Sequence, residues 1–267
     1  MATPKNFFVN FNFYTEVIEI FEVVVLAAGN GSRMGDFTSH LPKSLIPLNG
    51  IPIIDYILKK LFYLDIHRII FVVGYQKDKL INYLKENYSE EVELVFVTND
   101  QVERENGYSL FCARDYIKGD RFLLLMADHV VDTEIYKSVC EMAEQGDIIL
   151  ATDSIANLTD PEEATKVLLK GNRICKIGKN LDTYSAIDTG VFAMSKTIFS
   201  VLEKLVTKQY KIGISDLVTQ CIKDQMQVLS CDVSGYFWMD LDTKEDIELL
   251  LQQLAVDEEN TESDEIL

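Results

Sequence analysis

The chain has 267 residues, 48% of them hydrophobic, and this length and composition suit one α/β domain with a full core. Its 43 acidic and 25 basic residues give a formal net charge of −18, so the surface as a whole repels nucleic acid and anionic lipid. We therefore expect no nucleic-acid partner, and any phosphate site has to be a local cluster of basic residues and metal. Apolar runs such as 122–127 are too short to cross a bilayer, so we also expect no direct membrane insertion.

The two ends of the chain differ from the part between them. Residues 1–21 are aromatic but interrupted by glutamates, which is unlike a secretory signal peptide, and we interpret them as an N-terminal extension. Residues 256–267 are rich in Asp and Glu and are predicted to form an acidic disordered tail. One folded domain over 22–255 remains. The five cysteines show no CxxC spacing, which favours reduced thiols in a cytoplasmic protein.

Strands and helices are predicted to alternate from residue 22 onward. Strands are expected over 23–27, 68–74, 92–98, 121–127 and 147–151, and helices over 52–62, 77–87, 109–117 and 134–144. The segment 164–194 changes to short strand-like runs at 164–169, 173–177 and 189–194. Helices at 196–206 and 214–224, a strand at 226–233 and a helix at 244–255 complete the chain. This order predicts one doubly wound, mostly parallel, Rossmann-like sheet with a small antiparallel insertion.

A glycine-rich loop follows the first predicted strand. It reads LAAGNGSRM from Leu26, and Leu41-Pro42-Lys43 comes shortly after. Its small residues let backbone N–H groups approach a polyphosphate, and Arg33 and Lys43 supply positive charge. A dinucleotide-binding fingerprint does not fit, because Gly35 falls one position too late and no helix follows; a P-loop would need glycine rather than Pro42 before the lysine. The residues alone also allow a solvated turn with two surface bases.

Two carboxylates far apart in sequence are candidates for magnesium ligands. Asp128 comes directly after the strand at 121–127, at the edge of a parallel sheet where nucleotides bind, and Mg²⁺ prefers one or two carboxylates together with phosphate oxygens. Asp128 could instead be a helix N-terminal acid, although Asp132 is better placed to cap that helix. The second candidate lies in WMDLDT at 238–243, where Asp240 is favoured over Asp242 because Asp242 also suits a helix cap.

The motif LAAGxGxRM followed by PK resembles the signature of the sugar-nucleotidyltransferase superfamily, and this resemblance makes 22–255 a nucleotidyltransferase domain. It implies that Arg33 and Lys43 hold a nucleoside triphosphate and that Asp128 and Asp240 bind Mg²⁺. His129 is then expected to pack beside a metal ligand. The residues that the resemblance places against the nucleotide in this loop are Leu26, Ala27, Ala28, Gly29 and Gly31.

Further segments resemble the inositol-1-phosphate cytidylyltransferases, and the similarity covers 23–252. They are ENGYSL at 105–110, EEATKV at 162–167, IGKNL at 177–181, IDTG at 187–190 and FWMD at 237–240. The resemblance implies CTP as the nucleotide, with the amide of Asn106 and the backbone at Gly107 meeting cytosine. Without the resemblance, the same segment fits a glycine turn before a helix capped by Ser109. Many relatives carry a fused membrane phosphotransferase that is not present here, so a second step would need a separate membrane protein.

The same resemblance implies an acceptor site for a small phosphorylated alcohol. Lys166 and Lys179 would grip its phosphate, and Glu163 and Asp188 would accept hydrogen bonds from its hydroxyl groups; surface lysines and an ordinary turn aspartate are the alternatives. The predicted reaction transfers CMP from CTP to inositol 1-phosphate and releases pyrophosphate. Alternative acceptors are phosphocholine or an aminoalkylphosphonate, held by an aromatic cage, and a sugar 1-phosphate. A non-catalytic nucleotide-binding subunit is the alternative from another class, and a homodimer stays open.

Overall fold

The structure is a computed structural model that describes residues 22–31, 34–35, 40–156 and 162–253. The predicted N-terminal extension (1–21) and acidic tail (256–267) lie outside the described residues, and so does Arg33. Within the described part of the chain, no helix is both long and apolar enough to span a bilayer. All five cysteines are free thiols, as their spacing predicted, and three of them are buried.

A nine-stranded sheet forms the centre of the molecule, in the order β5-β4-β1-β6-β11-β8-β12-β10-β9. Its first half is parallel and consists of β1 (Glu22–Ala27), β4 (Arg68–Val73), β5 (Glu93–Thr98) and β6 (Arg121–Met126). β1 and β4 are buried along their whole length, which explains their near-continuous runs of valine, isoleucine and leucine. The α/β class and the Rossmann-like sheet predicted from the sequence are confirmed.

The second half of the sheet contains the antiparallel part. β11 (Ala186–Ser195) runs antiparallel between β6 and β8 (Ile148–Asp153), and β12 (Val228–Asp232) pairs parallel with β8. The hairpin of β9 (Lys166–Lys170) and β10 (Arg173–Gly178) follows β12. Because β9 also pairs with β11, the strands β8, β12, β10, β9 and β11 close into a ring. The antiparallel segment therefore reaches the middle of the sheet.

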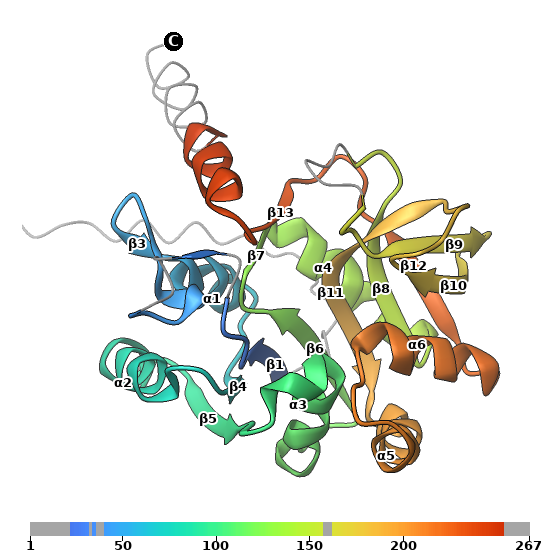
Figure 1. The fold of residues 1–267 in the computed structure, drawn as a ribbon, viewed down its shortest axis with the longest axis horizontal. Coiled ribbons are helices and arrows are strands. Elements are labelled where there is room, and N and C mark those ends of the chain that lie inside the picture. Colours follow the sequence, from blue (N-terminus) through green and yellow to red (C-terminus); the bar gives the residue numbers. More distant parts are fainter. Residues whose placement is uncertain (1–21, 32–33, 36–39, 157–161, 254–267) are drawn as a thin grey trace, which may run out of the picture.

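Helices cover both faces of the sheet (Figure 1). On one face the core includes apolar residues of α1 (Ile53–Tyr63), α2 (Lys77–Tyr88) and α4 (Thr133–Met142). On the other face it includes those of α3 (Glu105–Ala113), α5 (Phe199–Lys208) and α6 (Ile214–Lys223). The side chains of β1 alternate between these two cores, as the two-residue period of a strand requires. Short 3₁₀ turns lie at Lys43–Leu45, Val102–Arg104, Arg114–Tyr116, Ala143–Gln145 and Lys196–Ile198.

The third helix begins four residues earlier than the sequence predicts. We expected it to start at Ser109, but α3 starts at Glu105 and includes Gly107 in its first turn. A Cβ on Gly107 would lie 2.6 Å from the Ile212 carbonyl oxygen, and the Gly107 N–H donates to that oxygen at 2.9 Å. Glycine is therefore required here for close packing of α3 against the entry to α6, which is a tertiary effect that local sequence does not report.

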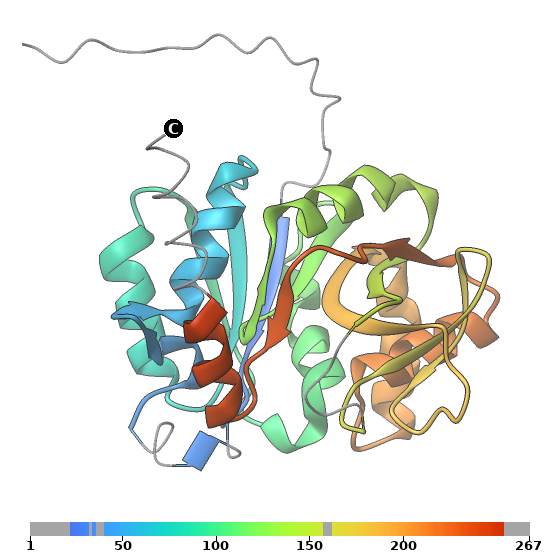
Figure 2. The same ribbon diagram turned by 90° about the horizontal axis from the view of Figure 1, so that it is seen from above.

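A small third core joins the loops above the sheet. It contains residues of the β2 (Pro47–Leu48) and β3 (Ile51–Pro52) hairpin region and of the helix that begins at 244, whose residues to 253 are described. In Figures 1 and 2 this last helix (red) lies near the blue hairpin segment. Two further short strands, β7 (His129–Val131) and β13 (Trp238–Asp240), pair antiparallel beneath it. Neither β7 nor β13 was predicted from the sequence.

Candidate active site

A cavity of about 250 Å³ opens at the carboxyl ends of β1 and β6. Its lining residues are Leu26, Ala27, Gly29, Asn30, Gly31, Pro42, Lys43, Ser44, Ala127, Asp128 and Asp242. Four of the five loop residues predicted to face a nucleotide are among them. The fifth, Ala28, is buried, and its carbonyl oxygen accepts the Tyr75 N–H at 3.2 Å, so Ala28 joins the loop to the chain after β4.

Lys43 is the cationic group among the described residues that line this cavity. It begins a 3₁₀ turn whose Leu45 packs in the core with α1, and only 10% of the lysine side chain is exposed. Its Nζ lies 2.7 Å from Asp128 Oδ2, 2.6 Å from Asp242 Oδ1 and 4.0 Å from Asp240 Oδ1. Burial alone would lower the pKa of Lys43, but the carboxylates of Asp128, Asp240 and Asp242 together raise it. The lysine is therefore a permanent positive charge among three acids.

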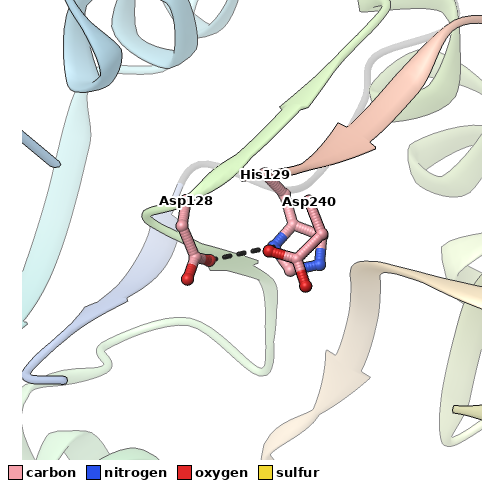
Figure 3. Close-up of side chains that lie close together, drawn as sticks. All are labelled: Asp128, His129 and Asp240. Atoms are coloured by element: carbon pink, nitrogen blue, oxygen red, sulfur yellow. Dashed lines mark hydrogen bonds and ion pairs between the residues drawn. The ribbon is translucent and has the colours of Figure 1, made fainter. Parts of the chain in front are cut away.

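The β7–β13 ribbon brings the two predicted metal ligands together. Asp240 pairs with His129 across the ribbon, and the Leu241 N–H donates to the Asp128 carbonyl oxygen at 3.0 Å. Figure 3 shows the carboxylates of Asp128 and Asp240 on the same side of this ribbon, with His129 behind Asp240. Ligand atoms of Asp128, His129 and Asp240 all lie within 4.8 Å of one another. The antiparallel pairing of two three-residue strands thus brings the cluster together from distant parts of the chain.

One carboxylate oxygen of this cluster has no hydrogen-bond partner among the described residues. Asp240 Oδ1 is buried, and its neighbours are Lys43 Nζ at 4.0 Å and His129 Nδ1 at 3.9 Å. A buried polar atom without a partner is costly unless an ion or water completes its environment. The donor set of two carboxylates beside a phosphate-sized cavity also suits a hard divalent cation. The residues present therefore fit a metal ion at Asp128 and Asp240.

The pKa values of Asp128, Asp240 and His129 are shifted in different directions by their surroundings. Burial would raise the pKa of Asp128, but Lys43 and His129 hold it well below its usual range. Burial, with repulsion from Asp128, raises the pKa of Asp240 to about 6 despite the attraction of His129. His129 Nδ1 lies 2.9 Å from Asp128 Oδ1; burial lowers the pKa of the imidazole, but Asp240 and Asp128 raise it to about 9. At neutral pH the site holds ionised acids and a charged imidazole.

His129 also touches the strand expected to carry acceptor contacts. Its ring lies against Gly190 of β11, where a Cβ would come within 2.6 Å of Cδ2, and Gly190 has φ +80° at an irregularity in the strand pairing. Asp188 accepts the Gly190 N–H at 2.8 Å, and burial raises its pKa to about 6. The sequence predicted that Thr189-Gly190 allows a substrate ring to approach closely; in the structure Gly190 also gives room to the His129 ring.

The predicted acceptor residues fall into two pairs. Asp188 on β11 donates its N–H to the Thr165 carbonyl oxygen at 2.9 Å, which places it beside the start of β9 and Lys166. The Lys166 Nζ lies 5.7 Å from the centre of the Tyr184 ring. Lys179 and Glu163 form an exposed ion pair at 2.8 Å. Asp188 and Lys166 lie on the ring of strands next to His129. Lys179 and Glu163 bind each other at the surface.

The predicted cytosine contacts, Asn106 and Gly107, lie outside the cavity lining. Gly107 packs on the backbone of Ile212, and the exposed Asn106 accepts the Ile214 N–H through Oδ1 at 2.8 Å, at the first residue of α6. Both therefore have a clear role in docking α3 on α6. The amide NH₂ of Asn106 is not used in this contact, and it could donate to a base.

Asp242 is the functional residue that sequence reasoning placed second. Asp246 Oδ2 accepts the N–H groups of Asp242 and Thr243, and Thr243 Oγ1 accepts the Asp246 N–H at 3.2 Å, so Thr243 and Asp246 cap the last helix between them. The Asp242 side chain binds Lys43 through Oδ1 at 2.6 Å. The ambiguity between a cap and a functional acid was visible in the sequence, but the lysine partner was not.

Comparisons with known proteins agree with this geometry. Residues 23–210 match the MobA-like NTP transferase domain. The bifunctional IPC transferase and DIPP synthase of Aquifex aeolicus is 36% identical over 84% of this chain and 50% of its own length, and that of Archaeoglobus fulgidus is 34% identical over 86% and 43%. The chain thus spans about half the length of these relatives.

A solved structure adds to the comparison. The inositol-1-phosphate CTP transferase from T. maritima superposes with a TM-score of 0.76 at 30% identity, covering 85% of this chain and 91% of that one. The resemblance inferred from the sequence motifs is confirmed by these matches. The glycine-rich loop, the buried lysine and Asp128 line one cavity, and Asp240 lies beside them. The chain belongs to the MobA-like NTP transferase family and is a nucleotidyltransferase.

Proposed function

We propose that the protein transfers CMP from CTP to inositol 1-phosphate, giving CDP-inositol and pyrophosphate. The observation that carries the proposal is the meeting of Lys43, Asp128 and Asp240 at the cavity lined by the glycine-rich loop. The choice of substrates is supported by the relatives, which include IPC transferases and an inositol-1-phosphate CTP transferase. In this proposal the domain acts on two small phosphorylated molecules.

CTP is proposed to bind along the first loop. Gly29 and Gly31 line the cavity, and Gly31 has φ +59°, a conformation in which backbone N–H groups can face a phosphate. Lys43 is the cation that meets the triphosphate in the described part of the cavity, and we assign Arg33 the same task. A buried ammonium costs no reorganisation when charge grows on the α-phosphoryl oxygens during transfer.

Mg²⁺ is the proposed cofactor, held by Asp128 and Asp240. When bound there, it would supply neutralisation of the charge on the phosphate oxygens and the departing pyrophosphate. The protein contributes the arrangement: the β7–β13 ribbon fixes the two carboxylates, and His129 holds Asp128 through its Nδ1 at 2.9 Å. No proton needs to be removed from the nucleophile, because a phosphomonoester oxygen is already an anion, so His129 has no task as a general base.

The acceptor is proposed to bind on the side of the ring of strands, between His129 and Lys166. Lys166 supplies positive charge for the phosphate of the acceptor, and the half-buried Asp188 supplies an oxygen for its hydroxyl groups. Holding both substrates this way converts the attack of the acceptor phosphate on the α-phosphorus into a unimolecular step. We assign Lys179 and Glu163 to the outer edge of this site, where they already form an ion pair.

A cationic acceptor such as phosphocholine is supported less well. An aromatic cage built from Tyr184, Tyr236 and Trp238 would need free ring faces and polar edges. The Lys166 ammonium already lies near the Tyr184 ring, and Trp238 Nε1 donates to Asp153 Oδ2 at 2.9 Å. A lysine at the entrance also repels the quaternary ammonium of choline. These contacts favour an acceptor that carries hydroxyl groups.

The proposal is tested by pyrophosphate release. The purified protein is incubated with Mg²⁺, each of four nucleoside triphosphates, and each of inositol 1-phosphate, phosphocholine, aminoethylphosphonate and glucose 1-phosphate. We expect turnover with CTP and inositol 1-phosphate only. Turnover with another acceptor would replace the substrate and keep the site, and nucleotide binding without any turnover would make the chain a non-catalytic subunit.

A pair of aspartate variants locates the reaction. Asp128→Asn removes one charge from the cavity, and Asp115→Asn removes one charge from an exposed ion pair with Arg114, at the opposite end of β6. We expect the first variant to lose turnover and the second to keep it. Equal activity in the two variants would place the reaction elsewhere.

A further inference from the structure

We propose that the Lys43 ammonium competes with a divalent cation for Asp128, and that the cation binds there only when the ammonium moves away from Asp128 toward Asp242. The inference rests on the proposed role of Asp128 and Asp240 as the metal-binding carboxylates. It assigns Asp242 as the residue that positions Lys43, a task that lies apart from metal binding.

The contacts of Asp128 carry the first step. Its Oδ2 accepts a hydrogen bond from Lys43 Nζ at 2.7 Å, and its Oδ1 lies 2.9 Å from His129 Nδ1. Both oxygens thus face a proton-bearing nitrogen of the protein. Each oxygen has a second lone pair, but a dication placed on it would lie close to the ammonium, and like charges at such distances in a half-buried site repel strongly. A metal ion at Asp128 therefore competes with Lys43.

The unpartnered oxygen of Asp240 shows where the metal ion that competes with Lys43 would bind. Asp240 Oδ1 is buried and accepts no hydrogen bond from the part of the chain that the structure describes, and Lys43 Nζ, at 4.0 Å, is too far to donate to it. The ammonium thus satisfies Asp128 and Asp242 but leaves Asp240 incomplete. Lys43 thus supplies positive charge to the carboxylates but makes no bond to Asp240 Oδ1. This is the behaviour expected of a side chain that takes the place of a metal ion.

Asp242 can keep an ion pair with Lys43 after the ammonium has left Asp128. Its Oδ1 lies 2.6 Å from Lys43 Nζ, and the cap of the last helix is made by Thr243 and Asp246 without the Asp242 side chain. Lys43 can therefore give up Asp128 and keep an ion pair, so a buried charge is never left without a partner. Because Asp242 also lines the cavity, this keeps the ammonium beside the phosphates rather than in solvent.

The first test measures metal binding without substrates. Mn²⁺ binding to the nucleotide-free protein is followed by electron paramagnetic resonance or calorimetry for wild type and Lys43→Met. The control is Lys118→Met, which removes the same charge from an exposed lysine paired with Glu93, before the start of β6 and far from the cavity. We expect the Kd for Mn²⁺ to fall at least tenfold in Lys43→Met and to change less than twofold in Lys118→Met.

Two results would overturn the inference in this test. One is the same Kd in wild type and Lys43→Met, which would mean that the lysine and the metal do not compete. The other is equal tightening in both variants, which would reduce the effect to the general charge of the protein.

The second test uses the wild-type chain, so it holds even if Lys43→Met does not fold. Lysines are acetylated briefly with and without saturating Mn²⁺, and the labelled peptides are quantified by mass spectrometry. We expect labelling of Lys43 to rise several-fold with Mn²⁺, because the lysine has lost its ion pair with Asp128, and labelling of Lys118 to stay constant. Unchanged Lys43 labelling while Mn²⁺ is bound would contradict the inference. Both readouts are independent of turnover, so an error in the proposed substrates leaves them interpretable.

Discussion

Asp240 lies directly opposite His129 in the antiparallel ribbon of β7 and β13, and this pairing sets its carboxylate beside that of Asp128. Each strand of the ribbon has only three residues. The ribbon is tied at both ends: the Leu241 N–H donates to the Asp128 carbonyl oxygen, and the Asp132 N–H donates to the Phe237 carbonyl oxygen at 2.8 Å. The precision of the acidic pair therefore depends on backbone hydrogen bonds that single side-chain changes leave intact.

Asp240→Asn should abolish most activity while the fold persists. The substitution keeps the shape of the side chain and removes the charge of a proposed metal ligand, so we expect kcat/KM to fall by at least about 100-fold. It also removes a carboxylate whose ionisation is opposed by burial and by Asp128, so the free energy of unfolding at neutral pH should not fall. Steady-state kinetics measures the fall in kcat/KM, and chemical denaturation measures the free energy of unfolding. Full activity in this variant would remove Asp240 from the site.

Lys43→Arg should fail to replace the lysine. The ammonium lies 2.6 and 2.7 Å from two carboxylates in a pocket where 10% of its side chain is exposed. The larger planar guanidinium does not fit the same point, although its charge is the same. We expect kcat to fall by about 10²–10³-fold, the usual effect of losing one preorganised charge-stabilising group. Recovery of wild-type kcat by arginine would show that only net charge matters there.

Gly190→Ala tests the contact between β11 and the acidic cluster. The new Cβ would come within 2.6–2.7 Å of the His129 ring at a backbone with φ +80°, so the ring and its bond to Asp128 must shift. Gly171→Ala is a matched control, because Gly171 also has a positive φ (+62°) but nothing lies within 4 Å of its Cβ position. We expect both variants to lose about 1–2 kcal/mol of stability from the backbone, and only Gly190→Ala to lose kcat.

Much of the fold follows from local patterns in the sequence. Buried β-branched runs predicted β1 and β4, and the apolar spacing after Pro52 predicted α1. The starts and ends of these elements agree within one residue, because short-range signals such as proline and strand length set them. The antiparallel position of β11 between β6 and β8 could not be read from its residues, since a fully buried strand carries no mark of its direction.

The candidate site was predictable only in part. The glycine-rich loop and Asp128 follow buried strands, so their position at the carboxyl edge is a local property. Asp240 was placed by resemblance, because nothing in a three-residue strand predicts its pairing. The contact between Lys43 and Asp242 was missed for the same reason, as it joins a 3₁₀ turn to the entry of the last helix. Asn106 and Gly107 carry a packing role that only the tertiary contact with α6 shows.

The role of Asn106 can be separated from its packing role by one substitution. Asn106→Asp keeps an oxygen for the Ile214 N–H at the start of α6, where a negative charge is also favourable. It removes the amide NH₂, the group left to meet a base. We expect the melting temperature to be kept and the KM for CTP to rise about tenfold or more, as for loss of one good hydrogen bond to a base. An unchanged KM would make Asn106 a packing residue alone.

Asp188 should make stability depend on pH between about 4 and 6. Burial raises the pKa of its carboxyl from 3.8 to about 6 in the folded chain, so the folded state holds the proton more tightly than the unfolded state. Its contribution is therefore lost as the pH rises through this window, because the unfolded chain ionises more easily. We expect Asp188→Asn to gain stability relative to wild type from pH 4 to pH 6 and to stay constant above it. Urea denaturation at several pH values measures the free energy of unfolding of both proteins. If this free energy changed with pH in the same way in wild type and Asp188→Asn, the buried environment of Asp188 would be contradicted.

We propose that Lys43, Asp128 and Asp240 form a site that joins CMP to inositol 1-phosphate. This can be followed by ³¹P NMR of one mixture of the protein, Mg²⁺, CTP and inositol 1-phosphate, with the Asp128→Asn variant in parallel. We expect two coupled diphosphate signals of CDP-inositol that grow together with an equal amount of pyrophosphate, and no such growth with the variant. Loss of CTP to CMP or CDP without a new diphosphate ester, or the same product from Asp128→Asn, would contradict it.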